Sequence, residues 1–230
     1  MKLVFLSDTH NKHNKLRIPE CDILFHCGDW TGMGYKHEVE RFAAWLDKQP
    51  ARYIVVIPGN HEKTFEKCLD SEESSMNWFK DHCPRAHLLI HEAVEIEGIK
   101  IFGSPYTPYF FNWAWNAGRT MIEAAQVFKP FIGDLWNKIP SDTQILITHG
   151  PPYGILDFCP DWVQKDKLVS VGCAELLKRI QQLNKPEIHA FGHIHLKGGN
   201  IQEHGGVKFI NAAICDESYN PTNSIIEINY

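Results

Sequence analysis

The chain has 230 residues, of which 43% are hydrophobic and 12% aromatic, and its formal net charge at pH 7 is −5. This hydrophobic content excludes an intrinsically disordered chain, and the length suffices for one large domain with a buried core, so we expect a single domain over residues 1–230. The acidic balance excludes the basic surface that holds long nucleic acids, but it is compatible with a small nucleotide ligand.

The N-terminal residues and the cysteines favour a cytoplasmic protein. The apolar run from Leu3 to Leu6 is too short for a signal peptide and ends in Ser7-Asp8, not at a small-residue cleavage site. No stretch approaches the roughly 20 apolar residues needed to span a bilayer, so we expect no membrane contact. The chain has seven cysteines without the spacing of a disulfide framework or a zinc site, which fits a reducing compartment.

Strands and helices are predicted to alternate in the first half of the chain. Short apolar runs predict buried strands over residues 3–6, 23–25 and 53–57. Apolar residues at helical spacing predict a helix from His37 to Lys48, which Pro50 ends, and a shorter helix is expected over residues 76–82. A hairpin turned at Glu97-Gly98 follows, with strands over residues 93–96 and 99–102.

The second half is predicted to contain helices, buried strands and closing hairpins. Helices are expected over residues 120–128, 131–138 and 173–183. Strands are expected over residues 145–147, 188–191, 200–203, 207–211 and 224–229. Strand–helix alternation followed by hairpins predicts an α/β fold in which two mixed sheets pack face to face and helices cover them.

Five short polar motifs stand directly after five of the predicted strands. They are Asp8-Thr9-His10, Gly28-Asp29, Gly59-Asn60-His61-Glu62, Thr148-His149-Gly150 and Gly192-His193-Ile194-His195. Parallel strands of an α/β fold bring their carboxyl ends together at one edge of the sheet, where ligands bind. We therefore expect these five motifs, which are far apart in the sequence, to converge in space.

The residue types in these motifs indicate a metal site with only oxygen and imidazole nitrogen donors. The candidate ligands are Asp8, His10, Asp29, Asn60, His149, His193 and His195. Such donors suit a borderline divalent ion, with Mn²⁺ favoured and Fe²⁺ or Zn²⁺ as alternatives. Seven ligands are too many for one ion that keeps a position open for water, but they suit two ions that share a carboxylate. Each residue alone is more often a core histidine or a helix cap, but five such motifs together favour the metal site.

With all five motifs intact, the chain resembles the calcineurin-like metallophosphoesterases. Further segments are similar to the small metallophosphoesterase domain-containing branch, also described as class III cyclic-nucleotide phosphodiesterase-like: Gly103-Ser104-Pro105, the aromatic stretch 106–115, residues 148–157 and Val171-Gly172-Cys173. The resemblance covers essentially the whole chain and implies a four-layer αββα sandwich of two mixed β-sheets flanked by helices. Some animal members of that branch carry Gly at the position of His193, which weakens their second metal site.

The resemblance also implies a role for each motif residue. One ion would be held by Asp8, His10, Asp29 and His195, and the other by Asp29, Asn60, His149 and His193. Asp29 would bridge the ions, a hydroxide shared between them would attack phosphorus, and His61 would protonate the leaving group as general acid. The alternative is that His61 merely orients Asn60. We expect Glu62 or another acid to orient the His61 ring.

The aromatic stretch from Tyr106 to Trp115 is the segment most suggestive of substrate contact. It follows a predicted strand and has neither alternation nor helical period, so we expect a loop over the active edge. A base could stack on Tyr109 or Trp113, or on Trp30 beside Asp29, although packing against the domain is the commoner role for any one ring. Asn60 and His61 are also expected to contact the substrate.

Together these features predict a cytoplasmic, dinuclear metal-dependent phosphoesterase. The preferred substrate class is a small phosphodiester such as a cyclic nucleotide, and neither a long nucleic acid nor a membrane is an expected partner. A phosphomonoesterase or a nuclease on the same site is an alternative, as is a non-catalytic scaffold of the same fold. The complete ligand set and His61 count against the scaffold. The sequence leaves the native metal and the oligomeric state open.

Overall fold

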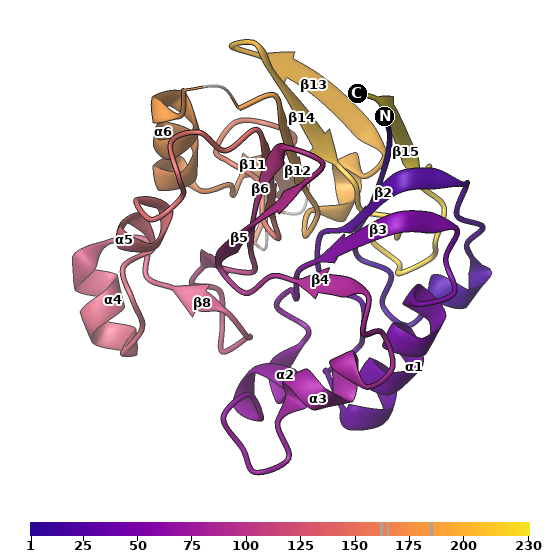
Figure 1. Ribbon diagram of the computed structural model, residues 1–230. Coiled ribbons are helices and arrows are strands. Elements are labelled where there is room, and N and C mark those ends of the chain that lie inside the picture. Colours follow the sequence, from indigo (N-terminus) through magenta and orange to yellow (C-terminus); the bar gives the residue numbers. More distant parts are fainter. Residues whose placement is uncertain (162, 165, 185) are drawn as a thin grey trace.

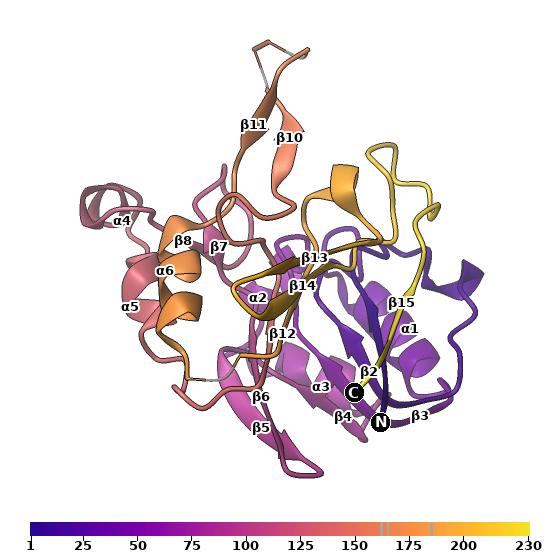
Figure 2. The same cartoon turned by 90° about the horizontal axis from the view of Figure 1, so that it is seen from above.

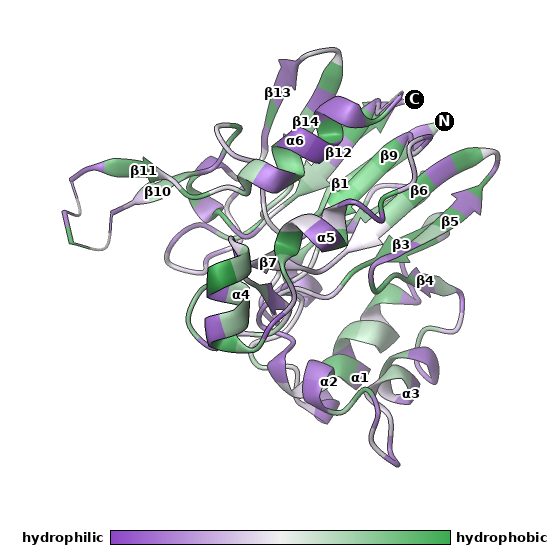
Figure 3. Ribbon diagram, turned by 90° about the vertical axis from the view of Figure 1, so that its left-hand side faces the viewer, coloured by the Kyte–Doolittle hydropathy of each residue, from purple (hydrophilic) through white to green (hydrophobic). Residues whose placement is uncertain are grey.

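The computed structural model contains two large mixed β-sheets packed face to face, with helices on their outer sides (Figures 1 and 3). It describes residues 1–161, 163–164, 166–184 and 186–230. The predicted four-layer αββα arrangement is therefore confirmed. Among the described residues, none belongs to a helix long and apolar enough to span a membrane.

The first sheet has the strand order β15-β1-β2-β3-β4. Its strands are β1 (Lys2–Leu6), β2 (Cys21–His26), β3 (Ala51–Val56), β4 (Ala86–Leu88) and β15 (Ile226–Asn229). Strands β1 to β4 run parallel, and β15 pairs antiparallel with β1, so the two chain ends lie side by side (Figure 1). Helices α1 (Lys36–Leu46), α2 (Lys63–Lys67) and α3 (Ser75–Lys80) cover its outer face.

The second sheet has the strand order β13-β14-β12-β9-β6-β5. Its strands are β5 (Glu92–Ile96), β6 (Ile99–Ser104), β9 (Ile145–Thr148), β12 (Ile188–Phe191), β13 (Asn200–His204) and β14 (Val207–Asn211). Strands β6, β9, β12 and β14 run parallel, and antiparallel β5 and β13 form the edges. Helices α5 (Ile132–Trp136) and α6 (Ala174–Gln182) pack on its outer face, and α4 (Met121–Val127) lies beside them.

Strand β1 shows why the central strands are continuous apolar runs in the sequence. Its side chains alternate between the two faces of the sheet: Leu3 and Phe5 enter the core between the sheets, whereas Val4 and Leu6 pack under the helices. Both faces are buried, so both sets of positions must be apolar. The central strands β1 and β9 are accordingly among the most apolar ribbons of the molecule (Figure 3).

Several short elements escaped the sequence-based prediction. They are α2, β4, the parallel pair β7 (Thr107–Pro108) and β8 (Asn116–Ala117), the antiparallel pair β10 (Phe158–Pro160) and β11 (Leu168–Ser170), and the 3₁₀ turns His13–Lys15 and His195–Lys197. Each is too short to show a hydrophobic period. The β10–β11 ribbon projects from the body at the edge of the sheets where the polar motifs lie (Figure 2).

Candidate metal centre

The five polar motifs converge at one edge of the sandwich because each follows the carboxyl end of a parallel strand. Asp8 follows β1, Asp29 follows β2, and Asn60 and His61 follow β3. From the second sheet, His149 follows β9, and His193 and His195 follow β12. The centre is therefore built from the loops of both sheets.

Six of the predicted ligands, together with His61, form overlapping groups whose donor atoms lie within 4.8 Å of one another: Asp8, His10 and His195; His10, Asp29 and His61; and Asp29, His149 and His193. Nε2 of His195 is 3.3 Å from Asp8 Oδ1, and Nε2 of His149 is 3.3 Å from Asp29 Oδ2. Asn60 joins the last group, since its Oδ1 lies 2.9 Å from His149 Nε2. All seven predicted ligands are thus close together, and Asp29 belongs to groups on both sides.

The donor set fits divalent cations. Backbone carbonyls lie 2.9 Å from His149 Nδ1 and from His195 Nδ1, at Cys27 and Asp216 respectively. A carbonyl oxygen can only accept, so each Nδ1 carries a hydrogen and donates it. In the neutral ring, Nε2 then has a lone pair that faces carboxylate oxygens. Acceptors that face acceptors across a buried space require a positive charge between them.

The pKa values of the histidines show that the buried carboxylates attract a positive charge to this site. Burial alone would lower the pKa of His149, but the charges of Asp29 and Asp8 and the hydrogen bonds override it and raise that pKa to about 9. Burial lowers the pKa of His193 to about 3 and that of His10 to about 4, so both rings are neutral at pH 7. The carboxylates therefore draw a proton onto His149, in the place where a metal ion would supply the positive charge.

Four of the seven predicted ligands adopt left-handed backbone conformations. Their φ angles are 52° at Asp8, 39° at His10, 54° at Asp29 and 67° at His193. Such values are uncommon for residues other than glycine and cost about 1–3 kcal/mol each. Cross-strand hydrogen bonds hold the loops in place, including His10 N–H to Asp29 O at 3.0 Å. Strain concentrated at these positions indicates that the loops are shaped for function and not for stability.

Glycines in three of the motifs pack directly against predicted ligands from other strands. A methyl group added at Gly192 would overlap Oδ2 of Asp8, and one added at Gly59 would overlap Oδ1 of Asp29. At Gly28, where φ is +103°, it would lie 2.5 Å from Nδ1 of His149. The motifs therefore need glycine because the side chains of the predicted ligands occupy the space of a Cβ.

Glu62 does not orient His61, so that expectation is wrong. Its buried carboxylate instead accepts backbone N–H groups of Gly59 at 2.6 Å, Asp29 at 3.1 Å and Thr31 at 2.9 Å. It thereby joins the loops that follow β2 and β3. The carbonyl of Gly32 orients His61 and lies 2.8 Å from its Nδ1.

A cavity of about 1310 Å³ opens over the candidate ligands. Asn60, His61, Tyr109 and Trp113, which the sequence suggested as substrate contacts, line this cavity. Trp30 does not, and its predicted role in base stacking is wrong. Its side chain is fully buried, stacks on Phe42 with ring centroids 4.9 Å apart, and donates from Nε1 to the Ile57 carbonyl at 2.9 Å.

Sequence reasoning missed Tyr219, whose ring forms one wall of this cavity. Its ring packs edge-on at 4.7 Å from that of His10 and at 5.4 Å from that of His195 (centroid distances). The turn that carries it folds around Asp216, whose carbonyl also accepts from His195. The run Asp216-Glu217-Ser218-Tyr219-Asn220 signals a turn but no ligand site, so the sequence offered no reason to select the tyrosine.

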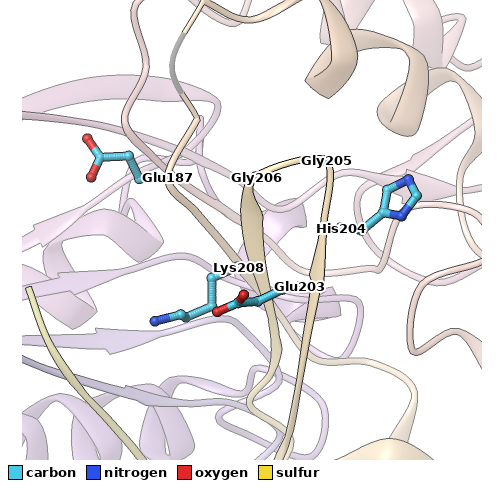
Figure 4. A pocket seen from close by; sticks show the side chains of 6 residues that line it. All are labelled: Glu187, Glu203, His204, Gly205, Gly206 and Lys208. Atoms are coloured by element: carbon cyan, nitrogen blue, oxygen red, sulfur yellow. The ribbon is translucent and has the colours of Figure 1, made fainter.

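Arg119 and the β10–β11 ribbon also escaped prediction. Arg119, Cys159, Pro160 and Asp161 line the same cavity. A second cavity, of about 420 Å³, lies at the β13–β14 hairpin (Figure 4) and is lined by Glu187, Glu203, His204, Gly205, Gly206 and Lys208. Its side chains carry mixed charge and do not converge on one point, and none belongs to the polar motifs.

Comparisons with known proteins agree with this geometry. Residues 1–197 match the family model described as calcineurin-like phosphoesterase. Metallophosphoesterase domain-containing protein 1 of Homo sapiens is 35% identical over 248 residues, covering 99% of this chain and 70% of the human protein, and the Mus musculus protein gives the same values. The phosphopantetheinyl hydrolase from Mycobacterium tuberculosis has a similar fold, with a TM-score of 0.58 at 12% identity over 99% of this chain and 95% of that one.

Proposed function

The chain belongs to the calcineurin-like phosphoesterase family, and from this premise we propose that it is a dinuclear phosphodiesterase acting on small nucleotides, including cyclic ones. The observation that carries the proposal is the position of Asp29, which shares ligand groups with His10 on one side and with His149 and His193 on the other. A carboxylate between two sets of imidazoles is the arrangement that two ions need when they share one ligand.

In this proposal the seven residues divide into two overlapping sets. Asp8, His10, Asp29 and His195 would hold one ion, and Asp29, Asn60, His149 and His193 would hold the other. Mn²⁺ is the favoured ion, with Fe²⁺ and Zn²⁺ as alternatives. Bound ions of this kind activate water at neutral pH and neutralise the negative charge of a phosphodiester.

His61 is the general acid of the proposed reaction. Its Nδ1 donates to the Gly32 carbonyl, so Nε2 is the atom that faces a leaving oxygen, and the doubly protonated ring passes its Nε2 proton to that oxygen and keeps its Nδ1 hydrogen. Nε2 lies 3.9 Å from Asp29 Oδ2, which puts the donor beside the proposed reaction centre. The ring is held by Gly32 and not by Asn60, which counts against the alternative that His61 merely orients Asn60.

The cavity supports a nucleotide as the substrate. Its volume of about 1310 Å³ exceeds what a bare phosphate fills, and Tyr109, Phe110 and Phe111 contribute aromatic surface. A base can stack on such a wall while the phosphodiester lies near His61 and Asp29. The net charge of −5 gives little attraction for a polynucleotide, which favours a mononucleotide substrate.

A substrate panel with Mn²⁺-loaded protein tests this function. Values of kcat/KM would be measured for 2′,3′-cyclic AMP, 3′,5′-cyclic AMP, a nitrophenyl diester, a nitrophenyl monoester, and single- and double-stranded oligonucleotides at equal phosphoester concentration. We expect a cyclic nucleotide to give the highest value. Faster cleavage of the monoester would indicate a phosphomonoesterase, and faster cleavage of the oligonucleotides a nuclease. No turnover of any ester would favour the non-catalytic scaffold.

A further inference from the structure

We propose that Trp113 is a positioning residue that holds the imidazole of His61 in the plane needed for proton transfer, an inference that rests on the proposed function. The two rings stack with their centroids 4.5 Å apart and an interplanar angle of 28°. Trp113 lines the cavity, but one face of its indole is taken up by His61. This contact gives Trp113 a role different from the base stacking expected from the sequence.

His61 needs such a contact because its hydrogen bond alone leaves the ring underdetermined. The bond from Nδ1 to the Gly32 carbonyl, at 2.8 Å, fixes one ring atom but permits the plane to tilt about that atom. His10 approaches edge-on, with centroids 4.6 Å apart and planes at 77°, and restrains one side. The flat indole restrains the whole face and so determines where Nε2 points.

Trp113 is itself fixed by the loop that carries it. The next residue, Ala114, donates its N–H to the carbonyl of Asn60 at 3.2 Å. Trp115 donates its N–H to Glu66 Oε1 at 2.9 Å, and its side chain is buried. The aromatic loop is therefore joined to the loop and helix on both sides of His61 in the sequence, which is the support that a positioning residue requires.

Lys63 adds a second restraint on the indole. Its Nζ lies 5.6 Å from the centroid of the Trp113 ring, within the range of a cation–π contact. Lys63 begins α2, two residues after His61. The acid and the cation thus come from one short segment and both engage the same ring.

The test uses two phosphodiesters without a base, so that stacking of a nucleobase cannot contribute. One is an alkyl diester with a poor leaving group, and the other is an activated nitrophenyl diester. The Mn²⁺-loaded wild type would be compared with Trp113→Ala, Trp113→Phe and, as a matched control from the same loop, Asn112→Ala. Asn112 is exposed and is not among the residues that line the cavity. Metal content and the melting temperature of each variant would be measured alongside.

For Trp113→Ala we expect kcat on the alkyl diester to fall roughly 10–100-fold, because misplacing a reacting group costs about that much. The fall should be much smaller on the nitrophenyl diester, whose leaving group needs little protonation. Trp113→Phe should recover part of the loss, and Asn112→Ala should lose little on either ester. On a His61→Ala background, Trp113→Ala should cause no further loss, because its effect passes through His61.

A spectroscopic readout independent of turnover completes the test. In wild-type protein loaded with diamagnetic Zn²⁺, the carbon-bound ring protons of His61 should resonate upfield because they lie over the indole, and Trp113→Ala should remove that shift. The proposal fails if the losses from Trp113→Ala and His61→Ala add, if both esters slow equally, or if Trp113→Ala raises only KM. If the wild type itself hydrolyses no ester, the proposed function fails. If the wild type is active and Trp113→Ala behaves like Asn112→Ala, only the role of Trp113 is lost.

Discussion

The backbone N–H of His193 donates to both carboxylate oxygens of Asp8, at 3.1 Å and 2.9 Å, although the residues are 185 positions apart. Asp8 follows β1 in the first sheet, and His193 follows β12 in the second. This hydrogen bond joins the two sheets at the candidate metal centre. Ions held there would therefore stabilise the packing of the sheets as well as serve chemistry.

A substitution at Gly192, which precedes His193, tests how closely the loop after β12 must approach the loop after β1. A methyl group at this position would overlap Oδ2 of Asp8, so Gly192→Ala must displace either the carboxylate or the loop. We expect it to lower the free energy of unfolding by about 1–3 kcal/mol and to weaken metal binding. Gly150→Ala is the matched control, since its added methyl group would first meet Thr107 Cγ2, at 3.3 Å. Equal metal affinity in the two variants would contradict the account.

Replacing His61 with Ala should separate proton transfer from metal binding. Turnover of a diester with a poor leaving group should fall roughly 10²–10⁴-fold, because the leaving oxygen then departs without a proton. The loss should shrink on a nitrophenyl diester, and metal content should stay near that of the wild type. Steady-state kinetics on both esters, with elemental analysis of the variant, provide the measurement. Equal losses on the two esters would remove the general-acid role.

His193→Gly should weaken the binding of one ion and leave the binding of the other unchanged. In the proposed assignment His193 serves only the ion that Asn60 and His149 also hold. We expect one tightly bound ion, a much weaker second one, and partial activity that recovers as Mn²⁺ is raised. Calorimetric titration of metal-free protein with Mn²⁺ measures both affinities. A variant that binds both ions as tightly as the wild type would show that His193 is not a ligand.

The buried His189 should make the protein less stable in mild acid. Burial lowers its pKa from 6.5 to about 3, and its Nε2 lies 2.8 Å from the Thr148 hydroxyl. Between these pH values the unfolded chain binds a proton that the folded chain does not, so the free energy of unfolding falls as pH drops through this window. One such group contributes at most about 1.4 kcal/mol per pH unit.

His189→Gln removes that titration and should flatten the dependence. Urea unfolding of chelator-treated wild type and variant at pH 7 and pH 5 gives the comparison, free of metal binding. The variant should lose less stability between the two pH values than the wild type. Parallel losses would show that His189 does not supply this sensitivity.

The convergence of the five polar motifs could be predicted because the strand topology brings them to one edge of the sheets. A polar residue directly after a buried parallel strand must lie at the carboxyl edge of the sheet, whichever strand it follows. The hydrogen-bond partners of the individual motif residues could not be predicted in the same way. Glu62 lies next to His61 in the sequence, yet its carboxylate turns toward the backbone of Gly59, Asp29 and Thr31.

The contacts of the aromatic residues could not be predicted from the sequence either. Trp30 and Trp113 both lie near predicted ligands and are equally suggestive as sequence, but Trp30 points into the core and Trp113 stacks on His61. The direction of a side chain after a strand depends on loop conformation, which hydrophobic pattern does not encode. Tyr219 was missed for a related reason, because a turn stabilised by Asp216 brings it to His10 from the far end of the chain.

The metal content of saturated wild-type protein beside that of Asp29→Ala tests the central claim most directly. Asp29 lies in ligand groups on both sides of the centre, so its removal should affect both ions. After saturation with Mn²⁺ and removal of free metal, elemental analysis should find two ions per wild-type chain and close to none in the variant. One ion or none in the wild type, or two in Asp29→Ala, would contradict a dinuclear centre bridged by this carboxylate.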